Sequence, residues 1–486
     1  MKTIFFEPYA LSRPHFENAL ELMQLHLDAG DEVSYYHCSG NLHACEVNKD
    51  HSIETCLDCI GRKLSGLHRL VNKGGNLKND NYLSLEESQK EVVKKWSRNF
   101  SSIAELKKFE YEGIDMGMGV ASSLISLLRD SEPDMTANSE LVNALFKASL
   151  SVFYSFTNRL KSDRPDLVYF FNGRFSNLRP LLRLCESMGI NFYVHERGSS
   201  IHKYGLFFNH LPHSPGAYHF NMLNTWAGER DEGGKIEIAN RYFVDRRNGI
   251  EQAFKSFITN QHPDLLPESW DESKRNIVIF NSSDDEFAAV GREFDNPKFG
   301  MQLNVLKYIK QRFSGDDCIN IYLRMHPNQE GLKNQVISET LQLYGGNFHV
   351  LPPDSPVSTY KLMESCNAVV TFGSTTGIES TFWKKPSILV GNALYKRLDV
   401  TYNPETPDDL VEMMRTVNDP KPVLGAYIYG FHRSTFGISY RHYKPLQLRE
   451  GLFMGHKIDS DAIYGRFFKY NLRRLKYRFF KLTEPI

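Results

Sequence analysis

Two short segments in the second half of the chain carry residue types that bind phosphate. Residues 324–327 read Arg-Met-His-Pro, and residues 373–379 read Gly-Ser-Thr-Thr-Gly-Ile-Glu. Arg324 can grip a phosphate with two N–H groups, and His326, held next to Pro327, can donate to it and be charged near neutral pH. The turn at 373–377 offers backbone N–H groups and hydroxyls, although an ordinary capped turn would use the same residues. The pair of segments predicts a phosphate site.

Each of these segments follows an apolar run that reads as a buried strand. Strands are expected at 275–280, 318–323, 347–351, 369–372 and 386–390, with a helix after the turn at 373–377. Polar residues follow several of these strands, and the carboxyl ends of parallel strands meet at one edge of a sheet, where ligands bind. Glu379 lies about one and a half helical turns beyond Ser374, where it could face a ribose or the solvent. The predicted nucleotide-binding residues are Ser282, Ser283, Arg324, His326, Pro327, Gly373, Ser374, Thr375, Thr376 and Glu379.

The first half of the chain shows the same pattern. Residues 3–6, 16–27 and 32–37 read as strand, helix and strand, which opens a βαβ unit. Further strands at 166–171 and 190–194 lead into Asn172 and Arg174, and into His195, Glu196 and Arg197. Charged residues directly after apolar strands indicate either a cleft or a structural ion pair, for instance of Glu196 with Arg174 or Arg197.

A cluster of cysteines follows the second strand. Cys38, Cys45, Cys56 and Cys59 lie within 22 residues and the last two are spaced C-x-x-C. Four thiolates could close a tetrahedral zinc site, which would be structural because no position stays open. Buried cysteines without metal, a disulfide and a redox pair are the alternatives.

Length and composition predict a soluble protein of several domains. The chain has 486 residues, with 58 Lys and Arg against 58 Asp and Glu, so its net charge indicates no nucleic-acid partner. No apolar run approaches the roughly 20 residues of a membrane span, and the N-terminus does not read as a secretory signal. A cytoplasmic location is expected.

Two regions depart from the α/β pattern. Residues 60–165 read as a charge-rich helical insertion, in which the glycines of 111–119 make a turn that lines a cleft or simply connects two helices. Residues 464–482 place apolar side chains at helical spacing between seven Lys and Arg residues. Such a basic amphipathic helix either lies on an anionic membrane or packs back on the protein.

Taken together, these motifs resemble the GT-B glycosyltransferases, and more narrowly those of bacterial capsule and surface-polysaccharide biosynthesis. The resemblance rests on 324–327 followed by 373–379, on 281–286, 172–174 and 195–198, and on the cysteine cluster. It implies an α/β fold of two Rossmann-like domains facing a cleft. We expect an acceptor-side domain at 1–262, a nucleotide-binding domain at 263–430 and a basic tail at 431–486.

The resemblance also implies a reaction that requires no cofactor. A sugar would move from a nucleotide-activated donor, a CMP-sugar by preference and otherwise a UDP- or GDP-sugar, to a glycan or lipid-linked acceptor. Arg324, His326 and residues 374–376 would stabilise the departing phosphate. Glu196 is the candidate general base, with His326 as the second catalytic residue, and Asn172, Arg174, His195 and Arg197 would line the acceptor side.

Other functions fit the same residues. A polyol-phosphate transferase or a sugar-nucleotide epimerase could use this architecture, and an epimerase could employ Asp285 and Glu286 beside the donor sugar. A non-catalytic, metal-stabilised scaffold of a polysaccharide assembly complex is the alternative from a different class. Nucleotide binding distinguishes the scaffold from the enzymes.

Overall fold

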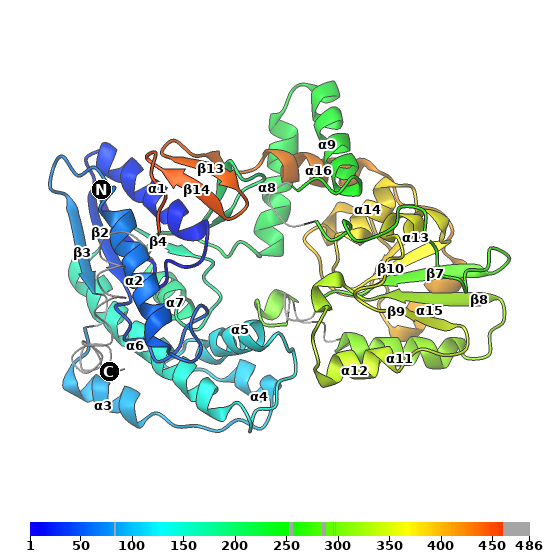
Figure 1. Cartoon of the computed structure of the whole chain (residues 1–486), viewed down its shortest axis with the longest axis horizontal. Helices are drawn as coiled ribbons and strands as arrows, with labels where there is room; N and C mark the ends of the chain where they lie inside the picture. The colour runs from blue at the N-terminus through cyan, green and yellow to red at the C-terminus, as the bar shows by residue number, and fades with distance from the viewer. Residues whose placement is uncertain (82–83, 252–255, 284–287, 295, 297, 460–486) are drawn as a thin grey trace. The chain divides into compact units, whose positions relative to one another are not determined.

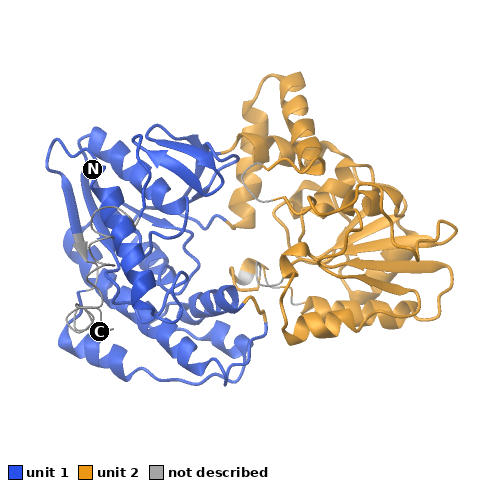
Figure 2. Ribbon diagram, viewed as in Figure 1, with its two compact units in different colours: residues 1–128, 132–212, 437–486 blue, residues 129–131, 213–436 orange. Residues whose placement is uncertain are grey.

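The computed structural model describes residues 1–81, 84–251, 256–283, 288–294, 296 and 298–459. The chain forms two compact units (Figure 2). Unit 1 comprises residues 1–128, 132–212 and 437–486, and unit 2 comprises residues 129–131 and 213–436. The chain therefore leaves unit 1 after residue 212 and returns to it at residue 437.

Unit 1 is built on a seven-stranded sheet with the order β12-β6-β5-β4-β1-β2-β3 in its described residues (Figure 1). The central strands β3-β2-β1-β4-β5 are parallel, whereas β6 and β12 run antiparallel at one edge. A separate hairpin consists of β13 and β14. The strands are β1 (Lys2–Phe6), β2 (Glu32–His37), β3 (Leu77–Asn81), β4 (Leu167–Phe171), β5 (Phe192–Arg197), β6 (Lys203–Phe208), β12 (Ile438–Ser439), β13 (Tyr443–Gln447) and β14 (Glu450–Phe453).

Helices cover both faces of this sheet because successive side chains of a strand point to opposite sides. In β1, Phe5 contacts His26 of α1, and the next residue, Phe6, contacts Phe156 of α6. The predicted helical insertion supplies most of the second layer. The helices of unit 1 are α1 (His15–Asp28), α2 (Ile53–Leu67), α3 (Glu87–Lys95), α4 (Ile103–Lys108), α5 (Met116–Leu128), α6 (Ser139–Asp163) and α7 (Arg179–Met188).

Unit 2 contains a five-stranded parallel sheet with the order β11-β10-β7-β8-β9 (Figure 1). Its strands are β7 (Arg275–Phe280), β8 (Ile319–Arg324), β9 (Phe348–Leu351), β10 (Ala368–Thr371) and β11 (Ser387–Leu389). The helices are α8 (Pro215–Gly228), α9 (Glu232–Arg247), α11 (Gln302–Phe313), α12 (Gln335–Leu341), α13 (Thr359–Ser365), α14 (Thr376–Phe382), α15 (Pro407–Thr416) and α16 (Leu424–Thr435), with short 3-10 turns η1 (Arg292–Phe294), η2 (Pro327–Gln329) and η3 (Lys396–Leu398).

A hydrophobic cluster packs against each face of this sheet. Ile277 and Ile279 of β7 face a cluster that includes residues of α11 and α15, whereas Val278 and Phe280 face a second cluster that includes α13. Every strand is apolar on both faces, as expected for a parallel sheet covered on both sides. The strands predicted at 275–280, 318–323, 347–351, 369–372 and 386–390 are therefore present, with small differences at their ends.

The units divide the chain at other places than the sequence predicts. The predicted boundary lay at 262/263, whereas residues 213–262 belong to unit 2. The reason is packing, because Met222 of α8 and Phe243 of α9 share a buried cluster with Ile378 of α14 and Ala426 of α16. The segment from 437 belongs to unit 1, because β12 pairs with β6.

Three sequence expectations change in unit 1. Residues 205–217 read as a loop in the sequence, but β6 occupies the start of that segment, and residues 77–81 of the predicted helical insertion form the edge strand β3. The glycine-containing segment 111–119 is not one continuous turn, because Gly117 and Gly119 lie inside α5. Gly117 permits close packing there, since a Cβ would lie 2.0 Å from the carbonyl oxygen of Leu106.

The predicted basic amphipathic helix at 464–482 lies outside the described residues. Within the described part of the chain, no helix combines the length and apolar character that crossing a membrane requires.

A carboxylate-guanidinium cluster ties α7 to the start of α5. Asp115 accepts hydrogen bonds from Arg179 Nη2 at 2.6 Å and from Arg183 Nε and Nη2 at 2.8 and 2.9 Å. Burial alone would raise the pKa of Asp115, but the bonds from Arg183 and Arg179 outweigh it and lower that pKa to about 2. The charged carboxylate therefore stabilises the folded state at neutral pH.

We predict that Asp115→Asn makes the stability of unit 1 less sensitive to acid. The folded pKa lies below the unfolded value near 4, so the stabilisation is complete above pH 4 and disappears as the pH falls through about 2. The variant should lose about 2 kcal/mol of unfolding free energy at pH 7 and much less at pH 2.5. Urea unfolding at both pH values measures this, with exposed Glu87→Gln as control, and an equal loss at both would contradict the account.

Candidate nucleotide site in unit 2

Three neighbouring strands of unit 2 carry the predicted nucleotide-binding residues at their carboxyl ends. β10 pairs with β7, and β7 pairs with β8, all in parallel. The register places Thr371 beside Phe280, and Phe280 beside Arg324. The segments that follow, 281–283, 325–327 and 372–376, therefore start at the same edge of the sheet, as the sequence predicts.

Arg324 was expected to bind phosphate directly, but its terminal nitrogens bind backbone carbonyls. The residue is 3% exposed, and its terminal nitrogens donate to the carbonyl oxygens of Pro352 at 2.6 Å and Ser355 at 3.0 Å. Burial lowers its pKa to about 10, and the charge of nearby Asp354 opposes this shift. Arg324 thus supports the loop after β9 and keeps a positive charge beneath the edge of the sheet at neutral pH.

His326 has a defined tautomer. Its Nδ1 accepts a hydrogen bond from the backbone N–H of Asn328 at 3.1 Å, and because a backbone nitrogen can only donate, the proton of the neutral ring lies on Nε2. The backbone N–H of His326 donates to Asn281 Oδ1 at 2.7 Å, which links the ends of β8 and β7. The ring packs edge-on against Phe257 at 5.4 Å between centroids. His326 is therefore held as an N–H donor.

The end of β7 places two buried serines beside this link. Ser282 and Ser283 are 3% and 1% exposed, and Gln302 fixes the backbone of Ser282 by bonds of 3.0 and 3.2 Å. The hydroxyl of Ser282 is buried and has no hydrogen-bond partner among the described residues. Asp285 and Glu286, the carboxylates of the epimerase alternative, lie outside the described residues.

The turn after β10 uses its own backbone donors. Thr371 Oγ1 accepts from the N–H groups of Ser374 at 3.1 Å and Gly373 at 3.5 Å, and Ser374 Oγ accepts from Thr376 N–H at 3.3 Å. The helix that follows, α14, has only seven residues. Side chains of the turn therefore already accept from three of the backbone N–H groups that were expected to bind phosphate. The Thr376 hydroxyl, by contrast, is buried without a partner among the described residues.

The two glycines of this turn make room for protein atoms. A Cβ on Gly373 would lie 2.9 Å from the carbonyl oxygen of Asn392, and one on Gly377 would lie 2.4 Å from Tyr395 Oη and 2.6 Å from Thr371 Cγ2. Tyr395 in turn donates its hydroxyl hydrogen to the carbonyl of Ser374. Close packing against protein atoms therefore accounts for both glycines.

We predict that Gly377→Ala destabilises unit 2 and disturbs the turn. The added methyl group must displace Tyr395 or Thr371, which costs about 1–3 kcal/mol. Thermal unfolding measures the loss. Gly228→Ala is the matched control, because a Cβ on this last residue of α8 would meet nothing within 4 Å and alanine favours helix. Equal stability of both variants would refute the packing role.

Glu379 faces neither the solvent nor an open ribose position. It is 2% exposed, with Oε1 accepting from Arg246 Nε at 3.0 Å and Oε2 accepting from Tyr360 Oη at 2.6 Å. Arg246 also donates to Thr375 Oγ1 at 2.9 Å. A ribose could bind Glu379 only by sharing these partners. Sequence reasoning missed Arg246, which lies 133 residues from Glu379 on α9.

Unit 1 brings the predicted acceptor-side residues to the ends of β4 and β5. Glu196 Oε2 accepts from Asn172 Nδ2 at 3.0 Å, and its side chain is 22% exposed. Its Oε1 lies 3.4 Å from Nδ1 of His15, a residue that the sequence did not single out. Burial first, and Arg197 next, hold the pKa of His15 well below its usual range. Glu196 is thus a positioned, partly accessible carboxylate beside a neutral imidazole.

The other predicted acceptor-side residues, Arg174, His195 and Arg197, make different contacts. His195 is fully buried and pairs with the carboxylate of Glu7, itself 1% exposed, so its predicted place in a cleft is wrong for this structure. Alternation along β5 explains this, because adjacent residues point to opposite faces. Arg174 lies over the ring of Phe175 at 4.7 Å, and Arg197 Nη2 donates to the carbonyl of Arg13 at 3.1 Å.

The cysteine cluster accepts hydrogen bonds at sulfur. Ala10 N–H donates to Cys59 Sγ at 3.2 Å, Gly40 N–H to Cys38 Sγ at 3.2 Å, and Asn48 Nδ2 to Cys56 Sγ at 3.1 Å. Burial raises the pKa of Cys56 to about 11 and that of Cys45 well above its usual value. In the described parts of the chain, no three His, Cys, Asp or Glu side chains are arranged to hold a metal. The zinc site therefore gains no support here and stays a sequence prediction.

These observations define an α/β protein whose two units contain a mostly parallel sheet and a fully parallel sheet, with a polar strand edge in unit 2. Residues 272–443, which include that edge, match the family described as "Capsule polysaccharide biosynthesis protein". This match agrees with the resemblance to capsule polysaccharide biosynthesis proteins that the sequence shows. A search of curated proteins gives no match.

Solved structures with a similar chain include glycosyltransferases. The Thermosulfurimonas dismutans KpsC beta Kdo 2,4 transferase is 12% identical, with 55% of this chain and 79% of that chain covered and a TM-score of 0.37. The beta Kdo 2,7 transferase of the same organism is 14% identical over 66% and 89% of the two chains, with a TM-score of 0.33. A kitacinnamycin glycotransferase is 12% identical over 89% and 94%, with a TM-score of 0.25.

Proposed function

We propose that the protein transfers a sugar from a nucleotide-activated donor to a glycan or lipid-linked acceptor in capsule polysaccharide biosynthesis. The observation that carries this proposal is the shared edge of β10, β7 and β8, where a histidine donor and two buried hydroxyls start from adjacent strands. This edge lies inside the segment that matches the capsule family. The proposed donor is a CMP-sugar, with UDP- and GDP-sugars as the other candidates.

The reaction needs a place for the negative charge that develops on the departing nucleotide. Donors fixed before the reaction stabilise such charge at low cost, because they need not reorient. In unit 2 the proposed fixed donor is the Nε2–H of His326, whose ring the Asn328 N–H holds. The hydroxyls of Ser282 and Thr376, which have no partner among the described residues, are proposed as further donors. Arg324 adds a positive charge from below while it holds the loop after β9. The proposal assigns no metal or other cofactor to this step.

The acceptor hydroxyl needs a base, and Glu196 is the proposed one. Asn172 holds one carboxylate oxygen and the backbone N–H of Arg197 donates to the other at 3.1 Å, which fixes the orientation of the group. The acceptor is proposed to meet Arg174, Arg197 and Asn172 on this edge. A lipid-linked acceptor would place the reaction at the inner face of the cytoplasmic membrane, with contact through residues 464–482.

A thermal-shift series with CMP, UDP, GDP, CDP and ADP tests the donor site. We expect one nucleotide to raise the melting temperature of the wild-type protein by a few degrees, because ligand at about 100 times its Kd adds about 2.7 kcal/mol of stability. His326→Ala should remove most of the shift. His202→Ala, an exposed histidine in the turn before β6, should retain it. The transferase proposal fails if no nucleotide shifts the wild-type protein.

The role of Glu196 is tested by Glu196→Gln. The amide has the same shape but cannot accept a proton, so we expect the turnover rate with nucleotide-sugar and acceptor to fall about 100-fold or more while nucleotide binding is unchanged. Glu186→Gln, on the surface of α7, is the matched control. A variant that retains the wild-type turnover rate and pH profile would exclude Glu196 as the base.

A further inference from the structure

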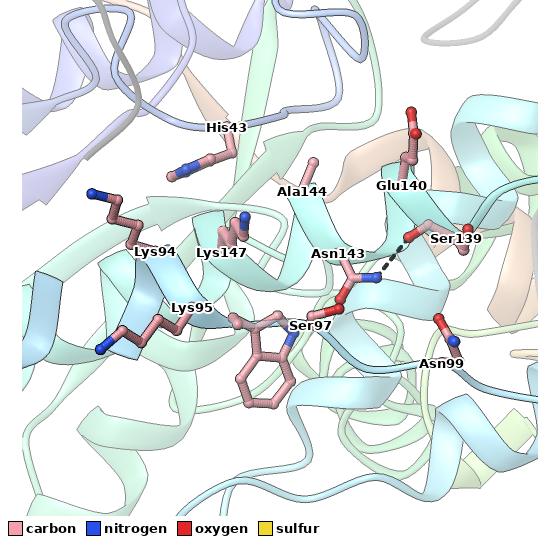
Figure 3. Close-up of a pocket in the computed structure, with 11 residues that line it drawn as sticks. His43, Lys94, Lys95, Ser97, Asn99, Ser139, Glu140, Asn143, Ala144 and Lys147 are labelled. Carbon is pink, nitrogen blue, oxygen red and sulfur yellow. Dashed lines mark hydrogen bonds between the residues drawn. The ribbon is translucent and has the colours of Figure 1, made fainter. Parts of the chain in front are cut away.

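A surface pocket in unit 1 has no part in the proposed transfer chemistry. Its volume is about 520 Å³, within the range of pockets that hold small ligands. The end of α3, the segment after it, the first turns of α6 and His43 form its walls (Figure 3). The lining residues are His43, Lys94, Lys95, Trp96, Ser97, Asn99, Ser139, Glu140, Asn143, Ala144 and Lys147.

The pocket is positively charged. Three lysines line it against one acid, Glu140, and Figure 3 shows Lys94, Lys95 and Lys147 toward one end and Glu140 toward the other. Lys95 pairs with Glu91 at 3.0 Å, outside the lining, whereas no described carboxylate forms an ion pair with Lys147. Burial lowers the pKa of His43 to about 4, with the charge of Lys147 acting in the same direction, so the imidazole is neutral at pH 7.

The walls are held in place before any ligand binds. Asn143 accepts from the backbone N–H of Arg98 at 2.8 Å and donates to the carbonyls of Arg98 at 3.2 Å and Ser139 at 2.9 Å (Figure 3). The ring of Trp96 packs on Phe146 and Phe109 at 5.1 and 5.8 Å between centroids. A fixed site loses little entropy when it binds a ligand.

Two polar groups of the lining have no protein partner. The indole N–H of Trp96 and Nδ1 of His43 are both buried and make no hydrogen bond within the described residues. Buried polar groups normally have partners, because leaving one without a partner costs free energy. A hydroxylated ligand would supply hydrogen bonds to such groups, together with Ser97, Asn99 and Ser139 at the wall.

We propose that this pocket binds a carboxylate-bearing oligosaccharide, a segment of the acceptor or growing glycan. The lysines would meet the carboxylates, and the amides, hydroxyls and indole would meet the sugar hydroxyls. Each lysine is a separate point charge and can meet one carboxylate along a sugar chain, and the lining contains no arginine for a two-pronged contact to phosphate. The inference rests on the proposed function, because it assigns an acidic glycan to that enzyme as acceptor or product.

Calorimetric titration of the full-length protein with trigalacturonic acid tests the pocket. We expect binding that weakens as salt is added, because the attraction between exposed charges is screened. Lys147→Gln should raise the Kd about tenfold, and the double variant Lys94→Gln/Lys147→Gln should raise the Kd further. Lys90→Gln is the matched control, since it removes the same charge from α3 outside the pocket, where Lys90 pairs with Glu87 at 2.8 Å.

Two further ligands distinguish the classes of occupant. Maltotriose, a neutral trisaccharide, should bind at least about tenfold more weakly than trigalacturonic acid. Inorganic phosphate should not compete with trigalacturonic acid. Equal binding of the neutral sugar, competition by phosphate, or equal loss in Lys90→Gln and Lys147→Gln would each overturn the proposal, provided that thermal melting shows each variant folded.

The nucleotide series separates this test from that of the proposed function. Lys147→Gln should retain the full nucleotide-induced shift, because Lys147 belongs to unit 1, whereas the predicted nucleotide-binding residues all belong to unit 2. Lost glycan binding with an intact nucleotide shift in that variant supports the pocket. Absence of any nucleotide shift in all proteins contradicts the transferase, whereas absence of trigalacturonate binding contradicts only the pocket.

Discussion

Parallel pairing of β10, β7 and β8 is the constraint on which the candidate nucleotide site depends. In a parallel sheet all strands end at the same edge, so three segments far apart in sequence leave the sheet together. The pairing in turn requires apolar side chains on both faces, because helices cover both sides. The alternation of Ile277, Val278, Ile279 and Phe280 between two clusters meets this requirement. Because the apolar strand residues fill the core, the polar residues that follow the strands are not needed there and can contact a ligand.

Buried charged side chains near the carboxyl ends of these strands are stabilised by hydrogen bonds. Arg324 lies below the surface with two backbone carbonyls as partners, and Glu379 lies below it with Arg246 and Tyr360. Removing a charge from water is costly unless hydrogen bonds replace the lost hydration. Both groups are therefore fixed by their surroundings. Of the side chains proposed to meet a ligand, His326 is oriented by the bond from the Asn328 N–H, whereas the hydroxyls of Ser282 and Thr376 have no partner among the described residues.

The sequence was sufficient for the central strands and for the positions of the polar strand ends. Apolar runs that stop at polar residues depend on local spacing, which a single sequence displays. It was not sufficient for the pairing of Glu379 with Arg246, or for His15 beside Glu196, because those contacts join residues 133 and 181 positions apart and have no local signature. The prediction for His195 was wrong because it placed every polar residue at the end of β5 in one cleft, whereas adjacent residues of β5 face opposite sides. The boundary at 212 was missed because α8 and α9 join unit 2 by packing, without a change in composition.

The return of the chain to unit 1 also determines the order in which the two units can be completed during synthesis. The backbone N–H groups of Arg441, His442 and Tyr443 donate to the carboxylate of Glu21 at 2.7, 2.8 and 3.0 Å, and β12 supplies the edge partner of β6. Every described strand of unit 2 is synthesised before those residues. Unit 1 is therefore completed after the strands of unit 2 are made, and until then Glu21 and the edge of β6 lack these partners, which lie more than 200 residues downstream of β6.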